Sequence, residues 1–468
     1  MKKYAIGMIG LGVMGKSLSL NMESKGFPVA GFDVDPKKRN EVREDFANTD
    51  NTVVESFSAL IDALESPHIV MMMVPAGKPV DDVIEMIKPH MKKGDILIDG
   101  GNSFFKDTER RSEALEAEGF QFIGMGVSGG ESGALHGPSL MPGGQESAYR
   151  RVESIFTAIA AKTEDGSCCT YIGPRGAGHY VKMVHNGIEY GDMQLISEAY
   201  FLLKSILNLR ADSLGKIFEE WNRGVLNSYL IDITARIFRK IDPETGKPVV
   251  DVILDKAGQK GTGKWTSQNA LDVGVAIPTI NSAVEARILS AFKDERVAAS
   301  KVLRGPENRF DDRGDVLIAA AHDALYASKI TSYAQGMSLL RWASKEYDYQ
   351  LNFAEIARIW KGGCIIRAEL LDDIKQAFLQ NPNLPNLMVH PKFAESLQNL
   401  QKNWRYTVST AIQSGVPMLA TGASLAYFDS YRSERLPANL LQAQRDFFGA
   451  HTYQRVDKPG SFHTHWEE

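Results

Sequence analysis

The chain has 468 residues, of which 43% are hydrophobic and 24% charged, as expected for a globular protein of two or three domains. The net charge is −5, so nothing in the composition suggests a surface for a nucleic acid or another polyanion. The cysteines, Cys168, Cys169 and Cys364, are odd in number and lack metal-ligand spacing, which favours a reducing compartment.

The first fifteen residues resemble a secretion signal, but other features argue against one. Met1-Lys2-Lys3 is basic and an apolar run follows it, yet four glycines interrupt that run and no small-residue cleavage site follows. A buried strand and a turn explain this stretch better. The sequence also lacks any run of about 18 apolar residues. We therefore expect no membrane-spanning helix and a cytoplasmic protein.

A strand, a glycine turn, a helix and a second strand open the chain. Residues 4–9 predict a buried strand, and Gly10-Leu11-Gly12-Val13-Met14-Gly15 follows it directly. Helical patterning over 16–24 and a strand over 28–32 come next, and Asp33 stands where that strand ends. In this order, G-x-G-x-x-G places the pyrophosphate of a dinucleotide at a helix N-terminus. The alternative is a tight turn that binds nothing.

Asp33 bears on which dinucleotide is bound. A carboxylate here can accept hydrogen bonds from the ribose hydroxyls of NAD, and it repels the 2′-phosphate of NADP. Asp35 adds a second negative charge. The basic residues 37–39 could bind that phosphate, but they follow Pro36 on the predicted next helix. We expect NAD as the cofactor, with NADP as the alternative.

Further strands are predicted at 69–74, 96–99 and 120–124. The loops that follow are Pro75-Ala76-Gly77, Gly100-Gly101-Asn102-Ser103 and, after the third strand, the turn Ser128-Gly129-Gly130. Ligands bind at the carboxyl ends of strands in open α/β sheets, so the first loop is suited to lie against the cofactor. The amides of Gly129 and Gly130 could hold a carboxylate. The alternative is a set of flexible turns.

The stretch 178–190 carries polar groups where a core helix would carry apolar ones. It predicts the start of a helix that continues to Leu203. Lys182, His185 or Asn186, and Glu189 are spaced at i, i+3/i+4 and i+7, which places them on one face. That face offers a potential base, a potential acid and two hydrogen-bonding groups. The alternative is a solvated face with a charge pair.

From about residue 178 to 432 the pattern is mostly helical, with breaks at 251–254, 258–263 and 304–314. Residues 217–224 and 356–363 parallel one another and each runs into an amphipathic helix, which suggests a duplicated helical unit or, alternatively, a chance similarity. The glycine-rich segment 258–265 carries two lysines that could clamp a phosphate. Arg287, on a predicted helix at 281–293, could bind a phosphate or make a surface ion pair.

The last thirty or so residues, after Pro437, are aromatic and irregular. They include Phe447, Phe448, Tyr453, Phe462 and Trp466. Such an apolar tail should pack on its own core or on another subunit. Aromatic residues next to an arginine are typical of interface hot spots.

Five motifs make the chain resemble the decarboxylating 6-phosphogluconate dehydrogenase family over essentially its whole length. They are Asp-Gly-Gly-Asn at 99–102, Ser-Gly-Gly-Glu at 128–131, the run 178–190, Lys-Gly-Thr-Gly-Lys-Trp at 260–265, and Gln-Arg-Asp-Phe-Phe-Gly-Ala-His at 444–451. The resemblance implies an α/β Rossmann-like dinucleotide-binding domain over 1–177 and a large all-α substrate and dimerisation domain over 178–435. It also implies an extended C-terminal tail over 436–468 that reaches the partner subunit of a homodimer.

The resemblance also implies an activity: oxidative decarboxylation of 6-phospho-D-gluconate to D-ribulose 5-phosphate and CO2, with reduction of NAD(P). It makes Lys182 the general base and Glu189 the general acid. The implied substrate-binding residues are Asn102, Ser128, Gly129, Gly130, His185 and Asn186 for the sugar acid, Tyr190, Lys260, Arg287, Arg445 and His451 for the phosphate, and Thr262. Arg445 and His451 would come from the partner. The expected cofactor-binding residues are Gly10, Leu11, Gly12, Val13, Met14, Gly15, Asp33, Val34, Asp35, Val74, Pro75, Ala76 and Asn102.

The chain departs from the family pattern at two places that concern the cofactor. NADP-using members typically carry Asn-Arg-Ser or Asn-Arg-Thr after the second strand, where this chain has Asp33-Val34-Asp35. The missing arginine removes the expected ligand of the 2′-phosphate and again favours NAD. Pro75 stands where the family often has lysine. Since no Asp, Glu and His cluster has metal-ligand spacing, we expect no metal.

Two other functions remain open. A β-hydroxyacid dehydrogenase for a smaller, unphosphorylated acid would share the glycine loop and the lysine on a helix, but it would not need Lys260, Arg287, Arg445 or His451. A non-catalytic dinucleotide-binding scaffold or sensor belongs to a different class of protein. The intact face of Lys182 and Glu189 argues against a scaffold.

Overall fold

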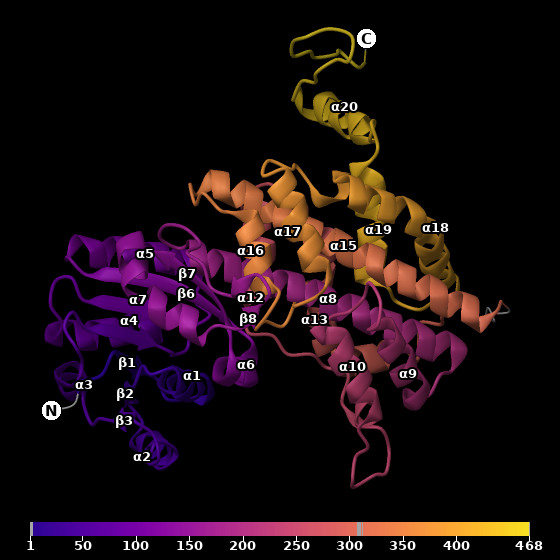
Figure 1. The fold of residues 1–468 in the computed structure, drawn as a ribbon. Helices are drawn as coiled ribbons and strands as arrows, with labels where there is room; N and C mark the ends of the chain where they lie inside the picture. Colours follow the sequence, from indigo (N-terminus) through magenta and orange to yellow (C-terminus); the bar gives the residue numbers. More distant parts are fainter. Residues whose placement is uncertain (1–2, 307–309, 311, 468) are drawn as a thin grey trace.

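The computed structural model describes residues 3–306, 310 and 312–467 (Figure 1). A seven-stranded sheet occupies the N-terminal part. Its strands are β1 (Ile6–Ile9), β2 (Val29–Phe32), β3 (Thr52–Val53), β4 (Ile69–Met72), β5 (Ile96–Asp99), β6 (Gln121–Ser128) and β7 (Ser139–Gly144). The helices between and after them are α1 (Val13–Ser24), α2 (Pro36–Asp45), α3 (Phe57–Ala63), α4 (Lys78–Ile87), η1 (Lys88–His90), α5 (Phe105–Ala117), α6 (Gly130–His136) and α7 (Glu146–Ile159). A small hairpin of β8 (Lys162–Thr163) and β9 (Gly166–Ser167) follows.

The sheet has the order β3-β2-β1-β4-β5-β6-β7, and only the β6–β7 pair is antiparallel. Alternate side chains of a strand enter separate apolar clusters, as Ile6 and Met8 against Ile9 illustrate. Both faces of the sheet are therefore covered, which is why its strands appear in the sequence as continuous apolar runs. Strands β2 and β3 are added on one side of β1 and the later strands on its other side. The carboxyl ends of β1 and β4 therefore border a crevice suited to a ligand.

The rest of the chain is helical. Its elements are α8 (Ala177–Leu207), α9 (Ala211–Trp221), α10 (Tyr229–Arg239), α11 (Val249–Val252), α12 (Thr262–Asp272), α13 (Pro278–Ala291), α14 (Lys293–Ala299), α15 (Gly314–Glu346), α16 (Phe353–Trp360), α17 (Leu370–Gln380), η2 (Leu387–Val389), α18 (Pro391–Gln413), α19 (Leu419–Tyr431) and α20 (Ala438–Gly449). The long helices α8 and α15 pack together in the centre (Figure 1). Among the residues that the structure describes, no helix combines the length and apolar character needed to span a bilayer.

A long helix followed by two short ones occurs twice, at the two places where residues 217–224 and 356–363 resemble one another, and the suggested duplication stays a prediction. The long α8 is followed by the short α9 and α10, and the long α15 by the short α16 and α17. The turns inside the two units meet. Tyr229 N donates to Arg367 O over 3.1 Å, and Glu369 N donates to Asn227 O over 3.1 Å.

Three boundaries differ from those expected. The strand predicted at 120–124 continues to Ser128, because β7 pairs with its second half and buries Met125 and Val127. The tail is not irregular throughout: 438–449 is helix α20, because its Leu, Gln and Ala residues favour a helix between the aromatic ones. The break at 251–254 falls partly within α11. The break at 304–314 includes 307–309 and 311, which lie outside the described residues.

The start of α8 lies directly against the sheet, and this contact positions the polar face. A Cβ at Gly178 would come within 2.3 Å of the carbonyl oxygens of Gly124 in β6 and Met141 in β7. Only glycine allows so close an approach of helix to strand. One turn later, a Cβ at Gly126 would come within 2.4 Å of the Cβ of Lys182. The sheet therefore covers the predicted polar face.

Candidate active site

The polar face of α8 is buried, so its alternative interpretation as a solvated face is wrong. Lys182 is 6% exposed and His185 is fully buried. Asn186 is also buried, and Glu189 is half-buried one turn further along the helix. Burying polar groups is unfavourable unless they have partners, so such a face needs neighbouring polar groups or a bound ligand.

A hydrogen-bonded chain links three segments around this face. His185 Nδ1 lies 3.4 Å from Lys182 Nζ and 3.1 Å from Asn186 Oδ1, and His185 Nε2 lies 3.3 Å from Ser128 Oγ. Asn186 Nδ2 donates to Thr262 Oγ1 over 3.1 Å. The structure thus brings together five predicted site residues from the end of β6, from α8 and from the start of α12.

Burial shifts the protonation of this face in the directions that acid–base chemistry needs. Desolvation lowers the pKa of Lys182, opposed by the nearby charge of Glu189. Desolvation raises the pKa of Glu189, opposed by the charges of Lys182 and Arg287 and assisted by Asp192. Burial also holds the pKa of His185 well below its ordinary value. A neutral amine can accept a proton and a protonated carboxyl can donate one.

Residues expected at a phosphate lie at the far end of the same face. The Arg287 guanidinium lies 3.6 Å from the centre of the Tyr190 ring. A Cβ at Gly263 would come within 2.5 Å of that ring, so the glycine-rich segment packs directly on Tyr190. This places Thr262, at the start of α12, beside Tyr190. A cationic and hydroxyl-bearing group of this kind suits a phosphate ester.

A first cavity, of about 420 Å³, lies over the glycine turn. Asp33 lines it, and its Oδ2 accepts a hydrogen bond from Leu11 N over 2.7 Å. Gly12 caps the N-terminus of α1, and nothing among the described residues lies within 4 Å of the position its Cβ would take. The open space at this helix N-terminus fits the pyrophosphate of a dinucleotide.

A second cavity, of about 620 Å³, lies between the sheet and the helical part. Its lining residues include Met73, Val74 and Pro75, which also line the first cavity, and Asn102, Lys260 and Trp265. The shared residues place the two cavities side by side. One dinucleotide spanning both would hold its adenosine end near Asp33 and its nicotinamide end near Asn102.

Comparison with known proteins decides the family. The family described as "6-phosphogluconate dehydrogenase, C-terminal domain" matches residues 178–466, and "NAD binding domain of 6-phosphogluconate dehydrogenase" matches residues 5–173. The chain belongs to the 6-phosphogluconate dehydrogenase family. It is 54% identical, over 100% of both chains, to "6-phosphogluconate dehydrogenase, NADP(+)-dependent, decarboxylating" from Bacillus subtilis and to "6-phosphogluconate dehydrogenase, decarboxylating" from Escherichia coli K12.

A solved structure of the family has the same fold. The Plasmodium falciparum 6-phosphogluconate dehydrogenase, described in its apo form and in complexes with NADP+ and with 6-phosphogluconate, superposes with a TM-score of 0.96. It is 44% identical, and the match covers 99% of this chain and 100% of that one. The Rossmann-like sheet followed by a large helical part, predicted from the sequence, is therefore confirmed.

Two predicted residues of this 6-phosphogluconate dehydrogenase family member do not reach the site within one chain. Arg445 lies on α20 and His451 just beyond it, and α20 projects away from the helical part (Figure 1). Arg445 Nη1 donates to Gln442 Oε1 over 3.1 Å, a neighbour on its own helix.

Sequence reasoning missed one buried neighbour of the site. The Trp360 ring packs edge-on to His185, with ring centres 5.5 Å apart, and its Nε1 donates to Met141 Sδ over 3.5 Å. Trp360 limits how His185 can rotate. The signal for it in the sequence is its place in the segment 356–363, which parallels 217–224 and by itself suggests a structural duplication.

Three carboxylates elsewhere lie close enough to share a cation: Glu164, Asp165 and Asp372. Lys361 Nζ lies 2.6 Å from Asp165 and 2.9 Å from Asp372, and Lys375 Nζ lies 2.7 Å from Asp165. These ammonium groups hold the pKa of Asp165 at about 2. The cluster is therefore satisfied as an ion-pair network.

Proposed function

We propose that this protein oxidatively decarboxylates 6-phosphogluconate to ribulose 5-phosphate and CO2, with NAD as its preferred oxidant. The observation that carries the proposal is the buried Lys182–His185–Asn186–Ser128 cluster, on the same helix as Tyr190, whose ring the Arg287 guanidinium covers. We place the reaction in the cytoplasm, because the three buried free thiols suit a reducing compartment.

The residues of the face have distinct tasks in this mechanism. Neutral Lys182 takes the proton of the C3 hydroxyl, while Ser128, His185 and Asn186 hold the sugar acid. A bound nicotinamide supplies the acceptor for the hydride that leaves C3. The resulting β-keto acid loses CO2, and the ammonium of Lys182 stabilises negative charge on the C3 oxygen. Glu189 then gives its proton to the carbon that carried the CO2, which is C2 of the substrate and C1 of the product, so the enediolate becomes the ketone of ribulose 5-phosphate. The Lys182 ammonium thus polarises the C3 carbonyl group, a task that a bound metal ion performs in some other oxidative decarboxylases.

A spectrophotometric assay tests the proposed reaction. In the presence of EDTA, 6-phosphogluconate should yield equal amounts of reduced cofactor and CO2. Gluconate and smaller β-hydroxy acids, which lack the phosphate, should react far more slowly because the groups at Tyr190 and Arg287 would have no partner. Equal rates with a plain β-hydroxy acid would favour a β-hydroxyacid dehydrogenase instead. A single stoichiometric burst of reduced cofactor would favour a dinucleotide sensor.

Asp33 supports the preference for NAD, although the Bacillus subtilis relative is named NADP(+)-dependent. The Asp33 carboxylate lines the first cavity at the end of β2. The nearby cation of Arg39 is already engaged: its Nε donates to Glu55 over 3.0 Å and its Nη1 donates to Asp33 O over 2.8 Å. A 2′-phosphate here would face a carboxylate and no free arginine among the described residues of this loop.

Replacing Asp33 with alanine should raise the KM for NAD about tenfold, since a charged hydrogen bond contributes roughly 1.5–3 kcal/mol. The KM for NADP should change less or fall, because the repulsion of its phosphate is removed. Initial rates with each cofactor measure this, and Asp45→Ala, an exposed position paired with Lys16, is the control for a lost charge. Faster turnover with NADP by the unmodified protein would overturn the preference.

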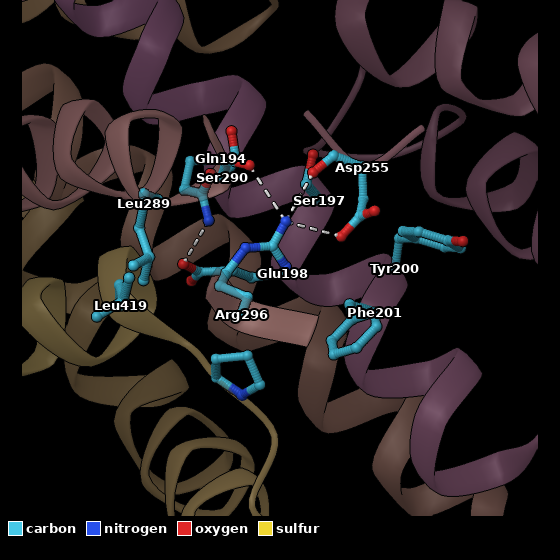
Figure 2. A pocket seen from close by; sticks show the side chains of 12 residues that line it. Gln194, Ser197, Glu198, Tyr200, Phe201, Asp255, Leu289, Ser290, Arg296 and Leu419 are labelled. Atoms are coloured by element: carbon cyan, nitrogen blue, oxygen red, sulfur yellow. Dashed lines mark hydrogen bonds and ion pairs between the residues drawn. The ribbon is translucent and has the colours of Figure 1, made fainter. Parts of the chain in front are cut away.

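We also propose that the protein is a homodimer in which residues 436–468 reach the partner, with 1–177 and 178–435 as its two domains. Leu440, Leu441, Phe447 and Phe448 on α20 are exposed, Phe448 by 73%. The helical part offers a hollow of about 380 Å³ between α8, α13, α14 and α19, whose lining includes the exposed Phe201, Leu289 and Leu419 beside the ion pair of Arg296 with Asp255 (Figure 2). A second copy would cover such surfaces.

Mixing two inactive variants tests whether the tail of one subunit completes the active site of the other. Lys182→Met and Arg445→Ala homodimers should each be nearly inactive, whereas refolding them together should restore about a quarter of the wild-type activity. Half of the dimers are then mixed, and in each of these one site combines an intact Lys182 with the intact Arg445 of the partner subunit. If the tail served its own chain, the mixture would remain inactive. Lys204→Met mixed with Arg445→Ala controls for refolding.

A further inference from the structure

Two loops form one wall of the second cavity. The first, 74–77, follows β4, and the second, 100–103, follows β5 and carries Asn102. The loops touch, since a Cβ at Gly101 would come within 3.0 Å of Val74 O. The position of Asn102 in the cavity therefore depends on how the two loops are held relative to one another.

Arg111, from α5, joins the two loops behind the cavity wall. Its side chain is only 2% exposed. Its Nη2 donates to Gly77 O over 2.9 Å, at the end of the first loop, and its Nε donates to Asp81 Oδ1 over 2.8 Å, on α4. Its Nη1 donates to Asp99 Oδ2 over 3.4 Å, at the start of the second loop. One guanidinium thus bonds both loops.

Asp99 connects Arg111 to the second loop through hydrogen bonds. Its fully buried carboxylate accepts hydrogen bonds from Gly101 N over 3.1 Å and from Ser103 Oγ over 2.6 Å. These two donors flank Asn102 in the sequence. A buried carboxylate needs its countercharge, so losing Arg111 would change how Asp99 holds the loop. The other neighbouring charge, on Arg110, reaches Asp81 but bonds neither loop.

We propose that Arg111 is a positioning residue for the dinucleotide. By holding the loops 74–77 and 100–103 in place, Arg111 fixes the shape of the cavity at its nicotinamide end. The proposal rests on the proposed function of this cavity. Arginine is required because its planar fork can donate to three acceptors in fixed directions, which a lysine ammonium at the end of a flexible stem cannot do. Arg111 itself lies behind the wall and does not touch the substrate.

Arg111→Met should raise the Kd for NADH about tenfold and lower kcat about tenfold, because small misplacements of a reacting group reduce rates steeply. NADH fluorescence titration and steady-state kinetics measure both values. Arg110→Met is a closely matched control: it removes the same charge from the preceding residue, which also pairs with Asp81. This control should stay within about twofold of wild type, since an exposed ion pair contributes little.

The values of kcat, of the KM for NAD and of the Kd for NADH together distinguish a positioning role from a loss of folded protein. A merely less stable variant would have a smaller active fraction, hence a lower kcat with an unchanged KM for NAD, and that result would overturn the proposal. So would an Arg111→Met protein with the NADH affinity of Arg110→Met. If Arg111→Met does not fold, Arg111→Lys decides, because it keeps the buried charge but cannot donate to Gly77 O and Asp99 at once, and a KM for NAD equal to wild type would refute positioning. If the unmodified protein neither binds NADH nor turns over, the proposed function fails as well.

Discussion

Replacing Lys182 with methionine should lower kcat by about a thousandfold or more, because it removes both the proposed base and the cation proposed to stabilise the C3 oxygen. Methionine fills the same buried volume without a charge, so α8 should keep its packing against β6. The Kd for NADH should stay near the wild-type value, since the dinucleotide cavities are lined by other residues. Stopped-flow and steady-state measurements of reduced cofactor and CO2 test this result.

Lys204→Met is the matched control, because Lys204 lies on the same helix and pairs with Asp251 at the surface. This variant should retain its turnover. Near-normal CO2 release by Lys182→Met would show that another group is the base. The pH profile gives a second check. Burial lowers the pKa of Lys182, so the neutral base persists to lower pH than for an ordinary lysine. Activity should fall as the pH drops through that lowered pKa.

Replacing Glu189 with glutamine should lower turnover about 10²- to 10³-fold, the usual contribution of a general acid. Glutamine keeps the size and hydrogen-bonding capacity of the side chain but has no acidic proton for C1. Binding of NADH should again be unchanged. Following release of ribulose 5-phosphate separately from reduced cofactor should show the later proton transfer more impaired than the oxidation.

The pH dependence of Glu189 has the opposite sign to that of Lys182. Burial raises the pKa of Glu189, so the acid stays protonated to higher pH than usual and is lost as the pH rises through that raised value. Wild-type kcat should therefore form a bell, and Glu189→Gln should lose its alkaline limb. Glu189→Asp, which keeps a shorter acid, should restore part of the rate. An alkaline limb that survives in Glu189→Gln would assign it to another group.

Spacing within short stretches of the sequence was enough to predict the secondary structure and the residues that share one face of a helix. The order of strand, glycine turn, helix and strand predicted the sheet and its dinucleotide crevice, because each signal lies within a few residues. Lys182 and Glu189 were placed on one helical face for the same reason. The motifs at 128–131 and 260–265 completed the candidate site, because the family resemblance implies which distant segments belong to it, and local spacing cannot.

Tertiary structure decided everything that depends on distant segments. Only the close contact of Gly178 with β6 and β7 shows that the polar face is buried, and burial in turn sets the direction of both pKa shifts. No periodicity could reveal that Arg111 reaches Gly77 and Asp99, because those contacts join helix α5 to the separate loops that follow β4 and β5. A sequence predicts which residues share an element, whereas desolvation and hydrogen bonding across elements are fixed only when those elements pack together.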